Sequence, residues 1–254
     1  MSKSKMTQPV DPEIADGRWK DLYRLGGIAC LLVAALITFA VIAYFIWPYT
    51  PGVVTTENIL RTLQTDRIGG LIALDVLTVP IVLLNVLPLL ALYAALKRVN
   101  ESYALIALVL GLIAVPALLA ARPVTEMVML SEKYAAATTV AARGQYLAAG
   151  DALLEHFGGT AWMVESFCLI LSGLIFALLM LRSSVFGKTT AYVGIATSLI
   201  GFGFIIPVIG PLLFFVNTIL SIVFSILMAR GLFRLGRQID RIEKGVIATG
   251  EFAQ

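Results

Sequence analysis

Six long apolar stretches constrain this chain more than any other feature. They cover residues 25–48, 68–96, 103–130, 159–181, 190–209 and 211–229. A run of about 20 apolar residues is long enough to cross the hydrocarbon core of a bilayer as a helix. Only 14% of the residues are charged, whereas a soluble domain has about 25%. The sequence therefore predicts an all-α fold, a polytopic integral membrane protein with six transmembrane helices in one domain, residues 25–229.

The distribution of Lys and Arg predicts the orientation. With the N-terminus inside, the inner segments hold 14 of these residues and the outer segments hold 5. Cytoplasmic loops carry the excess of Lys and Arg in membrane proteins. We therefore expect a multi-pass protein of the plasma membrane with both termini in the cytoplasm, residues 1–24 forming an N-terminal cytoplasmic segment.

Two segments outside the spans are predicted to be ordered. Residues 131–158 are rich in Ala and contain no Pro, which indicates one or two outer helices, broken near Gly144 and Gly150. Residues 230–254 form a basic amphipathic tail, with apolar and basic residues on opposite faces. Such a helix suits the surface of an anionic inner leaflet, but it equally well extends the sixth helix into the cytoplasm.

The sequence lacks the residues that several classes of functional site require. The basic residues are dispersed among membrane flanks, whereas nucleic-acid binding needs a basic face. The chain has one His and two Cys; Cys30 and Cys168 lie inside apolar stretches, typical of small core residues. We expect no metal site, no cofactor and no catalytic residue, since no nucleophile–base arrangement is visible.

Polar residues inside the apolar stretches are the candidates for function, because such residues are costly in hydrocarbon. Asp75, Glu165 and Asn217 each fall about 10 Å inside the outer face if their helices are continuous. Pro80 and Pro88 lie in the same predicted helix as Asp75, where each can remove a backbone hydrogen bond and produce a kink.

Arg122 is the natural counter-ion of this layer. It either pairs with Glu126, four residues on, at the membrane rim, or turns inward to meet Asp75 or Glu165. A polar cavity formed by Asp75, Arg122, Glu126, Glu165 and Asn217 is one interpretation; an ionic contact that merely holds helices in register is the other. A cavity would bind a lipid or small-molecule ligand in the outer half.

Small and polar side chains also recur at helical spacing. Ala191, Gly194, Ser198 and Gly201 share one face of the fifth stretch, and Asn217, Ser221 and Ser225 share one face of the sixth. Small residues let helices approach closely, and hydroxyl groups can bond across an interface. Both patterns favour packing inside a bundle.

Short motifs within residues 153–235 resemble those of a bacterial membrane protein family. They are Leu154-Glu155-His156-Phe157-Gly158-Gly159 before the fourth stretch, Leu181-Arg182-Ser183-Ser184 after it, and Tyr192-Val193-Gly194 in the fifth. Ala91-Leu92-Tyr93, followed by Lys97-Arg98-Val99-Asn100, continues the likeness upstream. The chain thus resembles the uncharacterised six-helix proteins known as domain of unknown function 4386. The resemblance implies six membrane helices and no particular activity.

Three functional classes remain open from the sequence. The first is a non-enzymatic membrane protein that binds a partner or a lipid, with the protein partner unknown. The second is a small transporter or channel that uses an outer-leaflet polar site. The third is an intramembrane enzyme. No continuous polar path crosses the predicted spans, which argues against transport, and the missing catalytic arrangement argues against an enzyme.

Overall fold

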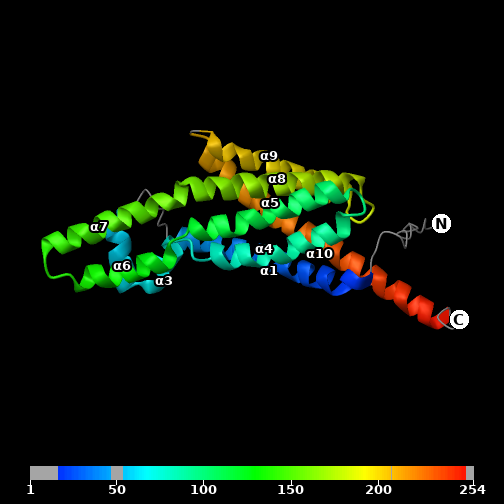
Figure 1. Cartoon of the computed structure of the whole chain (residues 1–254), viewed down its shortest axis with the longest axis horizontal. Helices are drawn as coiled ribbons and strands as arrows, with labels where there is room; N and C mark the ends of the chain where they lie inside the picture. The colour runs from blue at the N-terminus through cyan, green and yellow to red at the C-terminus, as the bar shows by residue number, and fades with distance from the viewer. Residues whose placement is uncertain (1–16, 47–53, 207, 250–254) are drawn as a thin grey trace.

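The computed structural model describes residues 17–46, 54–206 and 208–249, and they form an all-α fold. A 3-10 turn, η1 (Gly17–Trp19), opens the described chain. The α-helices are α1 (Lys20–Ile46), α2 (Thr56–Thr65), α3 (Arg67–Ala73), α4 (Thr78–Leu96), α5 (Glu101–Ala120), α6 (Val124–Ala136), α7 (Val140–Leu154), α8 (Thr160–Arg182), α9 (Lys188–Gly201) and α10 (Gly210–Thr249). Two further 3-10 turns are η2 (Glu155–Gly158) and η3 (Phe202–Ile205). The long helices run side by side along the longest axis of the molecule (Figure 1).

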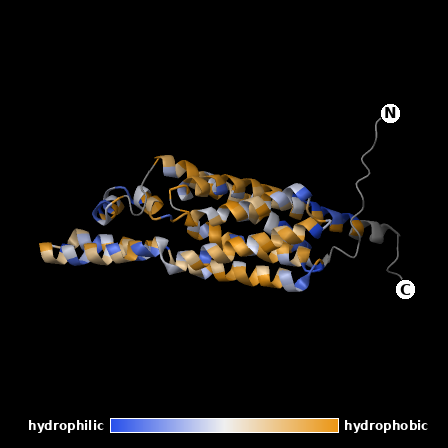
Figure 2. Ribbon diagram, turned by 90° about the horizontal axis from the view of Figure 1, so that it is seen from above, coloured by the Kyte–Doolittle hydropathy of each residue, from blue (hydrophilic) through white to orange (hydrophobic). Residues whose placement is uncertain are grey.

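Six helices form a closed ring in which each packs against two neighbours. The order around the ring is α1, α4, α5, α8, α9, α10 and back to α1. Hydrophobic residues predominate along the long helices of the ring (Figure 2). Large side chains such as Phe45, Leu212 and Phe214 are exposed on it. A surface of this kind needs lipid rather than water around it.

Among the described residues, five helical stretches are long and apolar enough to cross a membrane: Lys20–Ile46, Thr78–Leu96, Glu101–Ala136, Val140–Arg182 and Gly210–Ile242. The third of them joins α5 to α6, and the fourth joins α7 to α8. Together they indicate a multi-pass membrane protein. The predicted fifth span, residues 190–209, does not form one long helix. Its regular helix α9 has 14 residues and continues as the 3-10 turn η3. Within this turn Gly203 packs closely against Leu213 of α10, which leaves no room for a Cβ.

The main hydrophobic core fills the end of the ring where α1 begins. Tyr23, Leu96, Phe176, Met180 and Leu232 are among its fully buried side chains. The small-residue face predicted for α9 lies in the interior, with Ala191, Gly194, Ser198 and Gly201 all buried. On α8, Ser172 Oγ donates a 2.6 Å hydrogen bond to the Ala107 carbonyl of α5. Ser221 instead bonds to its own helix, at the Asn217 carbonyl.

The second predicted helix is interrupted, which corrects the sequence prediction. Between α3 and α4, Asp75 has a positive φ of 56°. The Asp75 N–H bonds to the Ile72 carbonyl, and the Val76 N–H bonds to the Leu71 carbonyl. This is the Schellman arrangement that ends a helix, in which the left-handed residue is usually Gly. Asp75 therefore lies at a helix end rather than inside a span.

The third predicted helix is interrupted as well. Helix α5 ends at Ala120 and α6 begins at Val124, after Pro123. Pro lacks the N–H that a continuous helix would need. Arg122 thus lies in the break, level with the break at Asp75.

Beyond these two breaks, α2, α3, α6, α7 and η2 form a second, smaller unit that we call the cap. Its own core contains Ile59, Leu60, Leu63, Leu74, Met127 and Tyr134. Helices α6 and α7 are antiparallel and project past the ring, with α2 against them (Figure 1). The predicted break near Gly144 and Gly150 is wrong: both lie inside α7. The turn lies just before it, where the Thr139 hydroxyl accepts a hydrogen bond from the Ala142 N–H at the helix start.

Gly150 sets the approach of α2 to α7, and we expect Gly150→Ala to destabilise the cap. The new Cβ would stand 2.5 Å from Thr56 Cγ2, and overpacking of this kind costs about 1–3 kcal/mol. Gly144→Ala is the matched control on the same helix. Nothing lies within 4 Å of its Cβ position, and Ala is favoured over Gly in a helix by about 1 kcal/mol. Thermal unfolding of both variants checks this, and an unchanged Gly150→Ala midpoint would contradict it.

The basic tail begins as part of the ring. Helix α10 continues without a break from Gly210 to Thr249, which agrees with the extension reading. Leu232, Leu235 and Ile239 of its apolar stripe are buried in the main core. Asp240 forms ion pairs of 2.5 Å with Lys20 and Arg24 of α1. The apolar face over these turns is therefore covered by protein and is not free to bind a membrane surface.

Candidate functional site

The predicted contact between Arg122 and Asp75 is present at the boundary between the ring and the cap. Arg122 Nε donates a 2.8 Å hydrogen bond to Asp75 Oδ2. Thr78 Oγ1 donates to the other carboxylate oxygen at 2.6 Å. The Arg122 side chain is 10% exposed and that of Asp75 is 39% exposed. The strained turn at Asp75 thus presents a carboxylate to an arginine that is nearly out of solvent.

Glu165 is the most buried carboxylate near this pair. It lies on α8, and only 7% of the residue is exposed. It is thus a polar residue within the apolar ring. Ser166 Oγ donates a 3.0 Å hydrogen bond to it, and Glu165 interacts electrostatically with both Arg122 and Asp75. Two carboxylates thus share the field of one guanidinium.

The other two candidate residues do not join this group. Glu126 is exposed on the first turn of α6. The helix break at Pro123 removes the four-residue spacing that was to pair it with Arg122. Asn217 lies against Gly201 of α9. Its Oδ1 is buried and accepts no hydrogen bond from the residues that the structure describes.

Of the two prolines of the second stretch, Pro80 differs from its predicted role. Pro80 lies in the first turn of α4, where backbone N–H groups have no partner within the helix in any case. It therefore fits the helix start and breaks no hydrogen bond. Pro88 lies inside α4 and is buried. The break in the second stretch is the turn at Asp75, between α3 and α4.

An open cleft of about 670 Å³ lies on the cap, between the start of α2 and the junction of α7 with η2. Its lining is Val54, Thr55, Thr56, Glu57, Leu147, Asp151, Leu154, Glu155, Phe157 and Gly158. None of the five residues predicted to surround a cavity belongs to this lining. The link between the two places is Phe157, because the Arg122 guanidinium lies 4.8 Å from the centre of its ring.

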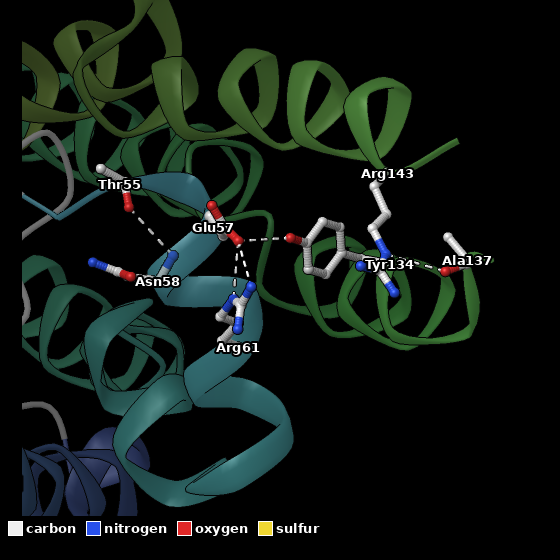
Figure 3. A network of polar contacts seen from close by, with 7 residues as sticks. All are labelled: Thr55, Glu57, Asn58, Arg61, Tyr134, Ala137 and Arg143. Atoms are coloured by element: carbon white, nitrogen blue, oxygen red, sulfur yellow. Dashed lines mark hydrogen bonds and ion pairs between the residues drawn. The ribbon is translucent and has the colours of Figure 1, made fainter. Parts of the chain in front are cut away.

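Glu57, one of the lining residues, is the centre of a polar network (Figure 3). Arg61 donates to Glu57 Oε1 from Nη2 at 2.7 Å and from Nε at 3.0 Å. Tyr134 of α6 reaches the same oxygen with its hydroxyl at 2.9 Å. Thr55 caps α2 by accepting from the Asn58 N–H, and the Thr56 hydroxyl donates to Asp151 of α7. These bonds tie α2 to both helices of the projecting hairpin.

This network and the cleft beside it were not predicted from the sequence. The available signals were the spacing of Glu57 and Arg61, four residues apart on one helix face, and the helix-capping Thr55. No feature of the sequence indicated that Asp151 and Glu155 would lie beside that helix, because the two segments are separated by two membrane-length stretches.

The Glu57 network makes part of the cap's stability depend on pH. The hydrogen bond from Arg61, and next that from Tyr134, hold the pKa of the Glu57 carboxyl below its usual 4.5. A lowered folded-state pKa adds stability that is complete above 4.5 and is lost as the pH falls through the folded-state value. We expect Glu57→Gln to remove this acid-side loss. Thermal unfolding across acidic pH checks it, and parallel curves for the variant and the parent protein would contradict it.

No family model, curated protein or solved structure matches this chain. The features of the molecule that bear on function are a multi-pass apolar ring, an ionic contact at its edge and a cleft on the cap above it.

Proposed function

We propose that this chain is a six-crossing plasma-membrane protein whose cap is an extracytoplasmic binding head without enzymatic activity. The observation that carries the binding role is the open cleft, because its walls are two helices held together by a separate core and by the Glu57 network. Small-molecule sites are concave, largely pre-formed and mostly about 300–1,000 Å³ in volume. The cleft of about 670 Å³ falls within that range.

The course of α8, α9 and α10 supports a sixth crossing. Residues pair antiparallel along α8 and α9, as Gly194 meets Ala177 and Gly201 meets Ile170. The same holds for α9 and α10, where Gly194 meets Phe224. Helix α9 with η3 therefore leads from the inner end of α8 to the far end of the ring, where α10 begins. Lys188 to Ile205 covers about 27 Å as 18 residues of helix, close to the thickness of the hydrocarbon core.

Orientation follows from charge. The start of α1 and the late turns of α10 are joined by the ion pairs of Asp240 with Lys20 and Arg24, so they lie at one end of the molecule. Most Lys and Arg residues are at that end, and the positive-inside rule assigns it to the cytoplasm. The cap then faces outward. Six crossings also agree with the predicted resemblance to the six-helix family.

Blocking the cleft tests the binding role. Gly158 lines the cleft and has nothing within 4 Å of its Cβ position, so a side chain can begin there, and we expect Gly158→Trp to obstruct the cleft. Gly187→Trp is the control, equally open but in the loop between α8 and α9. In a thermal-shift screen of small molecules on the purified protein in nanodiscs, we expect stabilising compounds whose effect is lost in Gly158→Trp and kept in Gly187→Trp. Compounds that still stabilise Gly158→Trp would place binding elsewhere.

A further inference from the structure

We propose that the cleft on the cap takes a small organic cation with an apolar group, such as an alkyl- or arylammonium compound. The inference rests on the proposed function, since it names the ligand class of the same cleft. Three of the ten lining residues are carboxylates and none is Lys, Arg or His. Because the chain as a whole carries a net charge of +3, the acidic lining is not a consequence of overall composition.

Not all of this negative charge is neutralised by the protein. Glu57 is paired with Arg61. Asp151 accepts a hydrogen bond from the neutral Thr56 hydroxyl, so its charge remains. Glu155 is exposed and has no ion pair among the described residues. Two carboxylates of the cleft therefore keep a charge that a ligand can meet.

The positive end of α2 also faces the cleft, and it has to be counted. A helix N-terminus is equivalent to about half a positive charge. Its groups are already used: Thr55 accepts from the Asn58 N–H, and Glu57 lies in the first turn of the helix. The nearby Arg122 lies over the Phe157 ring, is paired with Asp75 and is not part of the lining. The balance in the cleft stays negative.

The remaining lining indicates that the cation has an apolar part. Val54, Leu147, Leu154 and Phe157 contribute hydrophobic side chains. Apolar walls of this kind bury the hydrocarbon part of a ligand while a few charged groups fix its orientation. A bare metal ion would gain nothing from these walls, and a neutral apolar ligand would leave the two charges unmet.

The test compares three probes of similar size: benzyltrimethylammonium, benzyl alcohol and phenylmethanesulfonate. Each is titrated into the full-length protein in zwitterionic nanodiscs, with empty nanodiscs as the blank, and binding is followed by saturation-transfer NMR. We expect saturable binding of the cation, at least tenfold weaker binding of the alcohol, and none of the sulfonate. Glu155→Gln should weaken cation binding by about fivefold, the effect of one partly screened charge.

Controls separate this inference from the proposed function. Glu132→Gln removes an exposed carboxylate of α6 outside the cleft and should leave cation binding unchanged. If the alcohol or the sulfonate binds as well as the cation, and Gly158→Trp abolishes that binding, the cation class is wrong while the binding head stands. If the cation does not bind, or binds equally to Gly158→Trp, the inference is overturned.

Discussion

Arg122→Ala is expected to lower the free energy of unfolding by about 2 kcal/mol, less than the cost of breaking a fully buried ion pair because the Asp75 side chain is 39% exposed. The substitution removes the contact with Asp75 and the packing on Phe157. It also leaves the buried Glu165 beside Asp75 without a cation. Arg122→Lys keeps the charge but not the planar group that packs on the ring, so it should lose less. Thermal unfolding in one detergent compares the variants.

Two further variants separate the parts of this effect. Glu165→Gln in the Arg122→Ala background removes one of the two uncompensated carboxylates, so the double variant should be more stable than Arg122→Ala alone. Asp75→Asn keeps a residue that tolerates the left-handed conformation and removes only the charge. If Arg122→Ala has the same thermal unfolding midpoint as the parent protein, the ionic contact does not hold the cap on the ring.

Gly26→Ala is expected to be similarly damaging, by about 2–3 kcal/mol, because it overpacks the contact of α1 with α4. An added Cβ would stand 2.5 Å from the Cβ of Ala91. A Cβ atom is fixed to the backbone, so only movement of a helix relieves the clash. Thermal unfolding measures the loss.

A compensating change makes this prediction specific. Ala91→Gly removes the opposing Cβ, so the double variant Gly26→Ala with Ala91→Gly should recover most of the stability lost by Gly26→Ala. Gly236→Ala is the control on α10, where the nearest atom is Arg24 Cγ at an ordinary 3.5 Å. Failure of the double variant to recover stability would contradict the close packing of α1 on α4.

The fold class was predictable because it depends on long apolar runs, which composition alone makes visible. Helix ends were harder. The break at Asp75 depends on a left-handed residue that is usually Gly, and an Asp gives no such signal in the sequence. Pro123 did mark the second break, but a Pro is also common inside membrane helices. The end of α9 depends on Leu213 packing over Gly203, a contact between separate segments.

The candidate site, like the fold, was predictable only in part. The pairing of Arg122 with Asp75 followed from the cost of an isolated charge at the edge of hydrocarbon. The unbroken second helix, on which the shared depth of Asp75, Glu165 and Asn217 was based, is wrong, although Asp75 and Glu165 do lie within electrostatic reach of each other. The cleft could not be predicted from the sequence, because Glu57 and Glu155 come to line it only when α2 packs against the α6–α7 hairpin.

Cysteine accessibility tests whether the chain crosses the membrane six times with the cap outside. Single cysteines replace Thr138, Ser184, Val208 and Arg241 in a background without Cys30 and Cys168. Thr138, Ser184 and Arg241 are exposed, and Val208 is 95% exposed. With six crossings and the cap outside, a membrane-impermeant reagent should label positions 138 and 208 in intact cells, and positions 184 and 241 only after lysis. Labelling of 184 and 208 from the same side would contradict it, because α9 would then not cross.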